Sequence, residues 1–179
     1  MVILTFLNKF KMPKILILAE SGFGKTTSIG PIPELKIKGL DPLKTFIITC
    51  TNKGLPIPKW KQFYTTATPD GKGNFVQNAA RFPEKIPVII ATAAANKEIE
   101  NIILDDANYI MQDYYMGKAI STGFDVFKKI GLFMGNIFTA MDNVGDNKNF
   151  FVMAHHEEYR NSNLDTVSFR FKTVGKMVN

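Results

Sequence analysis

The stretch Lys14-Ile-Leu-Ile-Leu-Ala-Glu-Ser-Gly-Phe-Gly-Lys-Thr26 decides the fold class of this chain. Its apolar start, residues 14–20, runs into a glycine-bearing segment, which is typical of a buried parallel strand that leads into a loop. Residues 25–29 can then begin a helix, but Gly30-Pro31-Ile32-Pro33 must end it within about two turns. The sequence therefore predicts a strand, a glycine loop and a short helix in succession.

The segment from Ala19 to Thr26 matches the phosphate-binding pattern G-x-x-x-x-G-K-[ST], with Ala19 in the first glycine position. We expect Gly22 and Gly24 to let the backbone turn its N–H groups toward an anion, and the helix to add partial positive charge. Lys25 would reach the β- and γ-phosphates of ATP, and the Thr26 hydroxyl would ligate Mg²⁺. An ordinary glycine turn is the alternative. The predicted nucleotide-binding residues are Ser21, Gly22, Phe23, Gly24, Lys25, Thr26 and Thr27.

A pair of carboxylates, Asp105 and Asp106, ends another apolar run at residues 101–106. An acidic residue at the end of a neighbouring strand is the second half of a Mg²⁺-nucleotide site, because it holds the water shell of the ion. We expect Asp105 to make the Mg²⁺ contact and Asp106 to orient or deprotonate the attacking water. Two exposed carboxylates that only cap the following helix are the alternative.

The run His155-His156-Glu157-Glu158 resembles a metal cluster. Neighbouring residues of a strand point to opposite faces, however, so the two histidines cannot both face one ion, and zinc is disfavoured. At the end of a strand beside the Asp105 strand, His155 would instead sense the γ-phosphate. A plain hydrogen-bonded histidine at a strand end is the alternative.

Strands and helices alternate along much of the chain, with short connections. This alternation predicts a right-handed layered α/β fold with helices on both faces of a mostly parallel sheet. Together with the phosphate-binding pattern, it indicates the P-loop NTPase class. Thr122 and Asp125 resemble a capping box at the start of the clearest helix. The further predicted strands are residues 45–50, 101–106 and 150–154, and the predicted helices are residues 83–96, 109–116 and 123–141.

The least regular region is residues 51–81, which contain several prolines and glycines. They predict a long loop with a short strand at residues 62–65. Trp60 and Tyr64 in this loop would either stack on a nucleotide base or pack in the core.

The last predicted element changes character, because apolar and polar residues alternate over residues 167–172. Alternation is typical of a half-exposed strand. The sequence therefore predicts an antiparallel edge strand near the C-terminus.

The composition is that of an ordinary globular domain, with 179 residues, 45% of them hydrophobic and 21% charged. The single cysteine, Cys50, excludes a disulfide-rich secreted fold and points to a reducing compartment. The longest nearly apolar run, residues 86–95, is about half the length that crosses a bilayer. We therefore expect a cytoplasmic protein with no membrane partner.

The formal net charge is +6, and 19 of the 22 basic residues are lysines. These lysines are spread from Lys9 to Lys176, with no run longer than Lys128-Lys129. A solvated basic surface is the simplest interpretation, and it permits contact with nucleic acid.

With these residues in place, the chain resembles the short RecA-core ATPases encoded by bacteriophages. Such proteins occur among recombination genes, beside single-strand annealing and single-strand binding proteins. The D-D-x-x-Y-I-M and K-T-V-G-K segments are the most particular part of the resemblance. The segments that carry it are residues 19–27, 40–48, 55–60, 102–111, 154–155 and 172–177.

The resemblance implies a Mg²⁺-dependent ATPase that works on single-stranded DNA in recombination, replication or repair, in the cytoplasm of a bacterial host. It implies a homo-oligomer, with Lys176 reaching the nucleotide of a neighbouring subunit, and a phage single-strand binding or annealing protein as a further partner. The predicted catalytic residues are Lys25, Asp106, His155 and Lys176. We expect the DNA contacts on the loops at residues 117–123, with Lys118, and 159–166, with Arg160.

The chain is expected to comprise an N-terminal extension, residues 1–11, and one ATPase domain, residues 12–179, shortened at its C-terminal end relative to the proteins it resembles. Two other functions stay open. A small-molecule or nucleotide kinase shares the phosphate loop but relies on several arginines, and this chain has only Arg81, Arg160 and Arg170. A nucleotide-binding assembly protein without turnover is the other.

Overall fold

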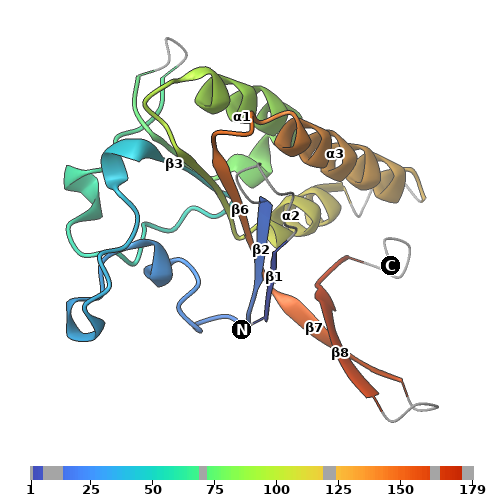
Figure 1. Cartoon of the computed structure of the whole chain (residues 1–179). Coiled ribbons are helices and arrows are strands. Elements are labelled where there is room, and N and C mark those ends of the chain that lie inside the picture. Colours follow the sequence, from blue (N-terminus) through green and yellow to red (C-terminus); the bar gives the residue numbers. More distant parts are fainter. Residues whose placement is uncertain (1, 6–13, 69–71, 119–123, 162–165, 175–179) are drawn as a thin grey trace.

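A computed structural model describes residues 2–5, 14–68, 72–118, 124–161 and 166–174 (Figure 1). The described residues form a six-stranded sheet, covered on one face by helices, and a separate two-stranded hairpin. The predicted α/β class with a mostly parallel sheet is confirmed.

The main sheet has the strand order β1-β2-β6-β5-β3-β4. The five strands from β2 to β4 run parallel, and β1 pairs with β2 in the antiparallel direction. The predicted buried strands are confirmed to within two residues at each end. The strands are β1 (Val2–Thr5), β2 (Lys14–Leu18), β3 (Thr45–Thr49), β4 (Phe75–Val76), β5 (Asn101–Asp105) and β6 (Asn149–Ala154).

The position of β6 between β2 and β5 has the greatest consequence for the site. Leu18 of β2 pairs with Ala154 at the end of β6, and Leu104 of β5 pairs with Val152. Parallel strands in this register bring their carboxyl ends to one edge of the sheet. The segments that follow β2, β6 and β5 therefore leave the sheet side by side.

Three α-helices pack against one face of the sheet. Their apolar residues meet Ile102 and Leu104 of β5 and Phe150 and Val152 of β6 in one buried cluster. The predicted helices are confirmed, although residues 83–85 form a 3₁₀ turn before the first one. Thr122 lies outside the described residues. The predicted capping box with Asp125 is wrong, because Asp125 is the first residue of the third helix and Phe124 is its N-cap, with no side-chain hydrogen bond. The helices are α1 (Ile86–Ala95), α2 (Asn108–Lys118) and α3 (Asp125–Asp142).

The prediction of helices on both faces is wrong. The second face is covered by loops and short 3₁₀ turns from residues 27–44 and 50–68, which we call the connecting layer (Figure 1, blue to cyan). The expected helix after the glycine loop is only the turn Thr27–Ile29, because Gly30 and Pro31 end it at once. A single turn has no appreciable dipole, so the expected helix charge is also absent.

The connecting layer has its own small core. Ile29, Leu55, Ile57 and Tyr64 are buried against Ile47, Ile103, Met153 and Phe75 of the sheet. The ring of Trp60 lies 5.1 Å from that of Phe75. Of the two interpretations of Trp60 and Tyr64, core packing therefore holds.

The predicted strand at residues 62–65 is also wrong. Trp60–Gln62 is a 3₁₀ turn, and the short edge strand is β4, which begins ten residues later than the predicted strand ends. Thr66 makes an isolated bridge to Phe75. Both segments are apolar and short, so local pattern does not decide which of them joins the sheet.

The C-terminal part forms an antiparallel hairpin of β7 (His156–Asn161) and β8 (Thr166–Phe171), which extends away from the main sheet (Figure 1). The predicted antiparallel pairing is confirmed, but its place is wrong. The antiparallel edge strand of the main sheet is β1, which lies within the expected extension, residues 1–11. Alternation marks an exposed strand without naming its partner. None of the described helices is long and apolar enough to cross a membrane.

One close approach in the connecting layer predicts a stability effect. Gly39 has φ +72°, and a Cβ there would lie 2.4 Å from the carbonyl carbon of Gly30. We expect Gly39→Ala to lower the free energy of unfolding by more than ~2 kcal/mol, from backbone strain plus overlap. The control, Gly135→Ala in the interior of α3, meets nothing within 4 Å and should raise it by about 0.5–1 kcal/mol. Urea unfolding measures both, and equal effects would contradict this packing.

Candidate functional site

The glycine loop follows β2 directly and adopts the conformation that the motif predicts. Gly22 and Gly24 have φ values of +82° and +78°, in the left-handed region. An added Cβ would meet nothing within 4 Å at either position. Glycine is therefore favoured here by backbone conformation and not by lack of space.

The loop leaves several backbone donors free. The N–H of Phe23 donates to the carbonyl of Glu20, and that of Ser28 donates to Gly24. Within the described part of the chain, the N–H groups of Gly22, Gly24 and Lys25 have no acceptor. Successive unpaired N–H groups in a tight loop form an anion-binding concavity.

The side chain of Lys25 is folded into the base of this loop. It is only 6% exposed, and its Nζ donates to the carbonyls of Ala19 and Glu20, each at 3.0 Å. Burial lowers the pKa of Lys25, while the nearby carboxylates of Asp106 and Asp105 raise it. The ammonium is thus held in place by neutral carbonyls and by two carboxylates beyond contact distance.

The next residue links the loop to the acidic pair. The Thr26 hydroxyl donates to Oδ2 of Asp105 at 2.8 Å, across 79 positions of sequence. Asp105 is buried, and its other oxygen, Oδ1, has no hydrogen-bond partner among the described residues. Burial, and secondly the neighbouring Asp106, raises the pKa of Asp105 to about 6. The interpretation of Asp105 as an exposed helix cap is therefore wrong.

His155 lies between the loop and the acidic pair because β6 lies between β2 and β5. Its Nδ1 is 3.3 Å from Nζ of Lys25, and its Nε2 is 3.5 Å from Oδ1 of Asp106. An ammonium can only donate, so Nδ1 accepts from Lys25 and the ring proton is on Nε2, facing Asp106. Burial lowers the pKa of His155, and Lys25 lowers it further, which favours this neutral form.

Asp106 is the last member of this group of side chains, and its backbone has an unusual conformation. Its φ is +56°, in the left-handed region that non-glycine residues rarely adopt. Its carbonyl accepts from the N–H of Tyr109, at the start of α2. A strained aspartate beside a buried lysine, a threonine and a histidine is the kind of feature that clusters at functional sites.

One positioning residue was missed by the sequence analysis. Asn108 is buried, and its amide bonds both sides of the His155 backbone, accepting from the N–H and donating to the carbonyl. It also donates to the carbonyl of Lys172, which follows β8. Asn108 therefore fixes His155 and closes the base of the hairpin. The available signal was a polar residue on an otherwise apolar helix face two positions after Asp106.

The structure thus brings together Lys25, Thr26, Asp105, Asp106 and His155. A polar pocket of about 300 Å³ adjoins them, lined in part by Ser21, Asn108, Tyr109 and His155.

The remaining predicted nucleotide-binding side chains are open to solvent. Ser21 and Thr27 are exposed, and the ring of Phe23 is 71% exposed. Lys176 lies outside the described residues, so its role stays a prediction. Within the described chain, no three His, Cys, Asp or Glu side chains form a metal-binding group.

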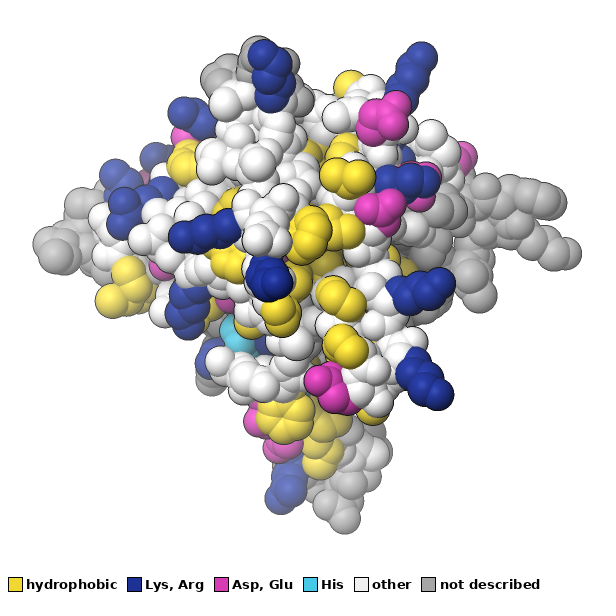
Figure 2. Space-filling view, turned by 90° about the vertical axis from the view of Figure 1, so that its left-hand side faces the viewer, with side chains coloured by type: hydrophobic (Ala, Val, Ile, Leu, Met, Phe, Trp, Pro, Cys, Tyr) yellow, Lys and Arg dark blue, Asp and Glu magenta, His cyan; other side chains and the backbone are white. Residues whose placement is uncertain are grey.

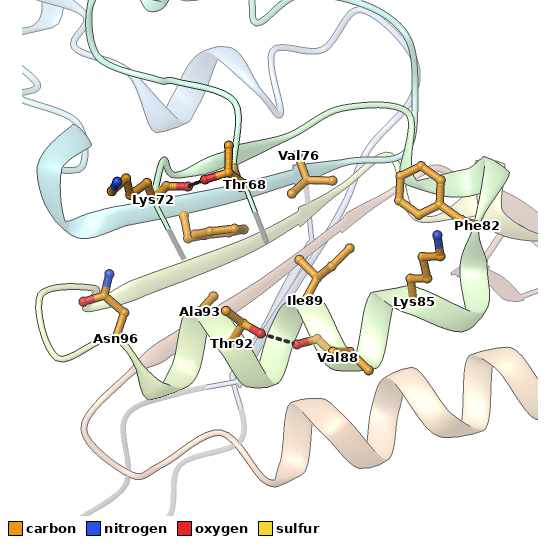
Figure 3. Close-up of a pocket in the computed structure, with 12 residues that line it drawn as sticks. Thr68, Lys72, Val76, Phe82, Lys85, Val88, Ile89, Thr92, Ala93 and Asn96 are labelled. Atoms are coloured by element: carbon orange, nitrogen blue, oxygen red, sulfur yellow. Dashed lines mark hydrogen bonds between the residues drawn. The ribbon is translucent and has the colours of Figure 1, made fainter. Parts of the chain in front are cut away.

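A second cavity, of about 480 Å³, lies away from this site, between α1 and the β3–β4 edge (Figure 3). Val76, Phe82 and Ile89 give it apolar walls, and none of the predicted site residues lines it. Its Thr92 hydroxyl is already bonded to the carbonyl of Val88. Of the two sites, the one at the glycine loop is therefore where polar and charged side chains come together.

Comparisons with known proteins add no relatives: no family model matches the chain, and no similar curated protein or solved structure was found. The arrangement of the site must therefore carry the functional argument.

The buried carboxyl of Asp105 predicts a pH effect on stability without ligand. Its folded pKa, about 6, lies above the ordinary 3.8, so the native state binds more protons and stability falls as pH rises through this window. The contribution of Asp105 to this loss between pH 5 and pH 8 should be about 1.4 kcal/mol. Asp105→Asn, which can still accept from Thr26, should remove this contribution. His155, whose pKa is lowered, acts in the opposite direction, so the contribution of Asp105 is taken as the difference between wild type and the variant.

The measurement is chemical unfolding in EDTA at both pH values. The exposed Asp142→Asn on α3 serves as the matched control and should keep the wild-type pH dependence. Parallel pH curves for wild type and Asp105→Asn would contradict the buried, unpaired carboxyl.

Proposed function

We propose that this chain binds ATP together with Mg²⁺ and hydrolyses it. The observation that carries the proposal is the hydrogen bond from Thr26 to Asp105, at 2.8 Å, beside the buried ammonium of Lys25. An ordinary glycine turn needs neither a buried lysine nor a carboxylate from a strand two positions away in the sheet. A nucleotide site needs both, in this arrangement.

The phosphates would be held by the glycine loop. Free N–H groups of Gly22 and Gly24 offer neutral donors, and Lys25 offers a positive charge. The three N–H groups of the ammonium are used by two backbone carbonyls of the loop and by Nδ1 of His155. A phosphate oxygen would replace one of these neutral acceptors and gain a strong charge-assisted hydrogen bond.

The residues that would hold Mg²⁺ are Thr26 and Asp105. The ion takes oxygen ligands and needs only one or two from the protein, with phosphates and water supplying the rest. Oδ1 of Asp105, buried without a partner, fits that demand. When bound, the ion would neutralise charge that develops on the transferred phosphoryl group.

Asp106 and His155 are the residues proposed to act on water. The Nε2–H of His155 points to Asp106, and this contact orients the carboxylate. Asp106 would then align the attacking water and accept its proton. His155 contacts Lys25 as well as Asp106. Movement of Lys25 on phosphate binding would therefore shift the imidazole and, with it, the position of the Asp106 carboxylate.

The wider role rests on the sequence resemblance. We propose that hydrolysis serves recombination, replication or repair on single-stranded DNA, in a homo-oligomer. The kinase alternative gains no support from the arginines of the described chain: Arg170 stacks on Tyr159, 3.5 Å from its ring centre, and Arg81 and Arg160 are exposed.

The first test is ATP binding and turnover by Lys25→Ala. Loss of the ammonium should weaken Mg·ATP binding at least about tenfold and abolish turnover, while the loop backbone keeps its shape. The exposed Lys128→Ala on α3 is the matched control and should behave as wild type. Turnover is measured with and without single-stranded DNA, and affinity by calorimetry.

Unchanged affinity in a folded Lys25→Ala protein would remove the nucleotide site. Wild-type affinity with no turnover, with or without DNA, would leave a binding protein that does not hydrolyse. Turnover only with a small phosphate acceptor would make it a kinase.

A separate test concerns Lys176. If it completes a neighbour's site, turnover per subunit should rise with protein concentration. Lys176→Ala should still bind ATP, and mixing it with Lys25→Ala should restore part of the activity, since some mixed interfaces then hold an intact loop and an intact lysine. No recovery despite proven co-assembly would exclude Lys176 from the mechanism.

A further inference from the structure

The connecting layer carries much of the positive charge of the molecule. Its two segments contain six lysines and two acidic residues, Glu34 and Asp41, a net charge of +4 out of +6 for the whole chain. Residues 75–150, which include the three helices, contain seven basic and nine acidic residues, a net charge of −2. Two of these nine acidic residues, Asp105 and Asp106, belong to the site, and the three helices together carry no net charge. The excess of positive charge therefore lies on the connecting-layer face of the sheet.

Most of these lysines are unneutralised. Lys44 pairs with Glu100 at 2.7 Å. The other five are exposed, and none has an ion pair within the described part of the chain. No acidic residue occurs at all in residues 50–68. We call this set the lysine surface: Lys36, Lys38, Lys53, Lys59 and Lys61.

The two segments that supply the lysine surface form one layer. A Cβ on Gly30 would lie 2.9 Å from the side chain of Ile57, so residues 27–44 and 50–68 pack against each other as well as on the sheet. Figure 2 shows this side of the molecule, where dark blue basic side chains surround yellow hydrophobic ones. The lysines are thus gathered by the fold although they are scattered in the sequence.

Exposed apolar side chains lie among these lysines. Phe63 is 45% exposed, Leu35 66% and Leu43 76%. Phe63 follows Lys59 and Lys61 within four residues, on a 3₁₀ turn that the buried Tyr64 anchors to the sheet. An exposed aromatic ring close in sequence to unneutralised lysines suits a ligand with both flat apolar faces and negative charges.

We propose that the lysine surface binds single-stranded nucleic acid, with lysines on the phosphates and Phe63 stacking on a base. Bases of a single strand expose their faces, whereas those of a duplex are already stacked. The site lies on the face of the sheet opposite the helices. It differs from the two segments that the sequence suggested, residues 117–123 and 159–166, whose described parts belong to α2 and to the β7–β8 hairpin. The inference rests on the single-stranded DNA part of the proposed function and names the surface that binds the strand, and this binding requires no nucleotide.

The test is fluorescence anisotropy of a labelled oligothymidylate with the nucleotide-free chain over a series of salt concentrations. Each phosphate contact contributes about 0.7 to the slope of log affinity against log salt. The variant Lys53→Gln/Lys59→Gln/Lys61→Gln should therefore lower the slope by about 2. The matched control, Lys97→Gln/Lys128→Gln/Lys129→Gln on the helical side, should leave it unchanged.

Phe63→Ala separates stacking from charge. It should weaken binding roughly tenfold and leave the salt slope as it is. Circular dichroism checks the fold of each variant, and single Lys→Gln variants, each expected to lower the slope by about 0.7, replace the triple variant if it does not fold.

Several outcomes would overturn the proposal. The first is no binding to the oligonucleotide. The second is an equal decrease of the salt slope in the control variant. The third is a decrease seen only in a further variant, Lys118→Gln/Arg160→Gln, which removes basic side chains from the segments that the sequence suggested. Equal or tighter binding to polyglutamate or to phosphatidylserine vesicles would point to an acidic protein or a membrane instead.

Because no nucleotide is present, a failure to bind the oligonucleotide would count against the single-stranded DNA role and leave the ATP site untouched. A failure of ATP binding or turnover would leave the oligonucleotide result standing.

Discussion

The site depends on the parallel register of β2, β6 and β5. That register brings the Thr26 hydroxyl within 2.8 Å of Asp105 and places His155 between Lys25 and Asp106. These residues come from three separate parts of the sequence, and the three parts would not meet if the strand order changed. A one-residue slip of β6 would turn its buried residues to the other face, so the hydrophobic core enforces the geometry of the polar group.

The arrangement is costly without a ligand. A buried ammonium, a carboxylate with an unpaired oxygen and an aspartate in the left-handed region all oppose stability. The three N–H groups of Lys25 have acceptors, but all of these are neutral, and Asp105 has a partner for only one of its oxygens. A bound phosphate would give Lys25 a charged partner, and a cation would pair the free oxygen of Asp105, so ligand binding should recover free energy that is lost on folding. A purely structural turn would gain nothing from keeping such groups.

The sequence predicted the local elements of this fold but not how segments distant in sequence pair and pack. Continuous apolar runs located the central strands, and the spacing of Gly24, Lys25 and Thr26 located the loop. Proline and glycine after Ile29 predicted a short helix, but not that loops would cover a whole face of the sheet. The contact of His155 with Lys25 depends on strand order, which no local pattern contains. Asn108 was missed because its partners are backbone atoms.

The central claim is that the glycine loop and the acidic strand act as one Mg²⁺-nucleotide site. The most direct measurement is a double-mutant cycle on the Mg·ATP dissociation constant, with Thr26→Val, Asp105→Asn and the double variant. The account predicts strong coupling between the two residues. Each single variant should bind Mg·ATP less tightly than wild type, and the double variant should bind only slightly less tightly than the more impaired single variant. Additive losses, or no loss in either single variant, would contradict it.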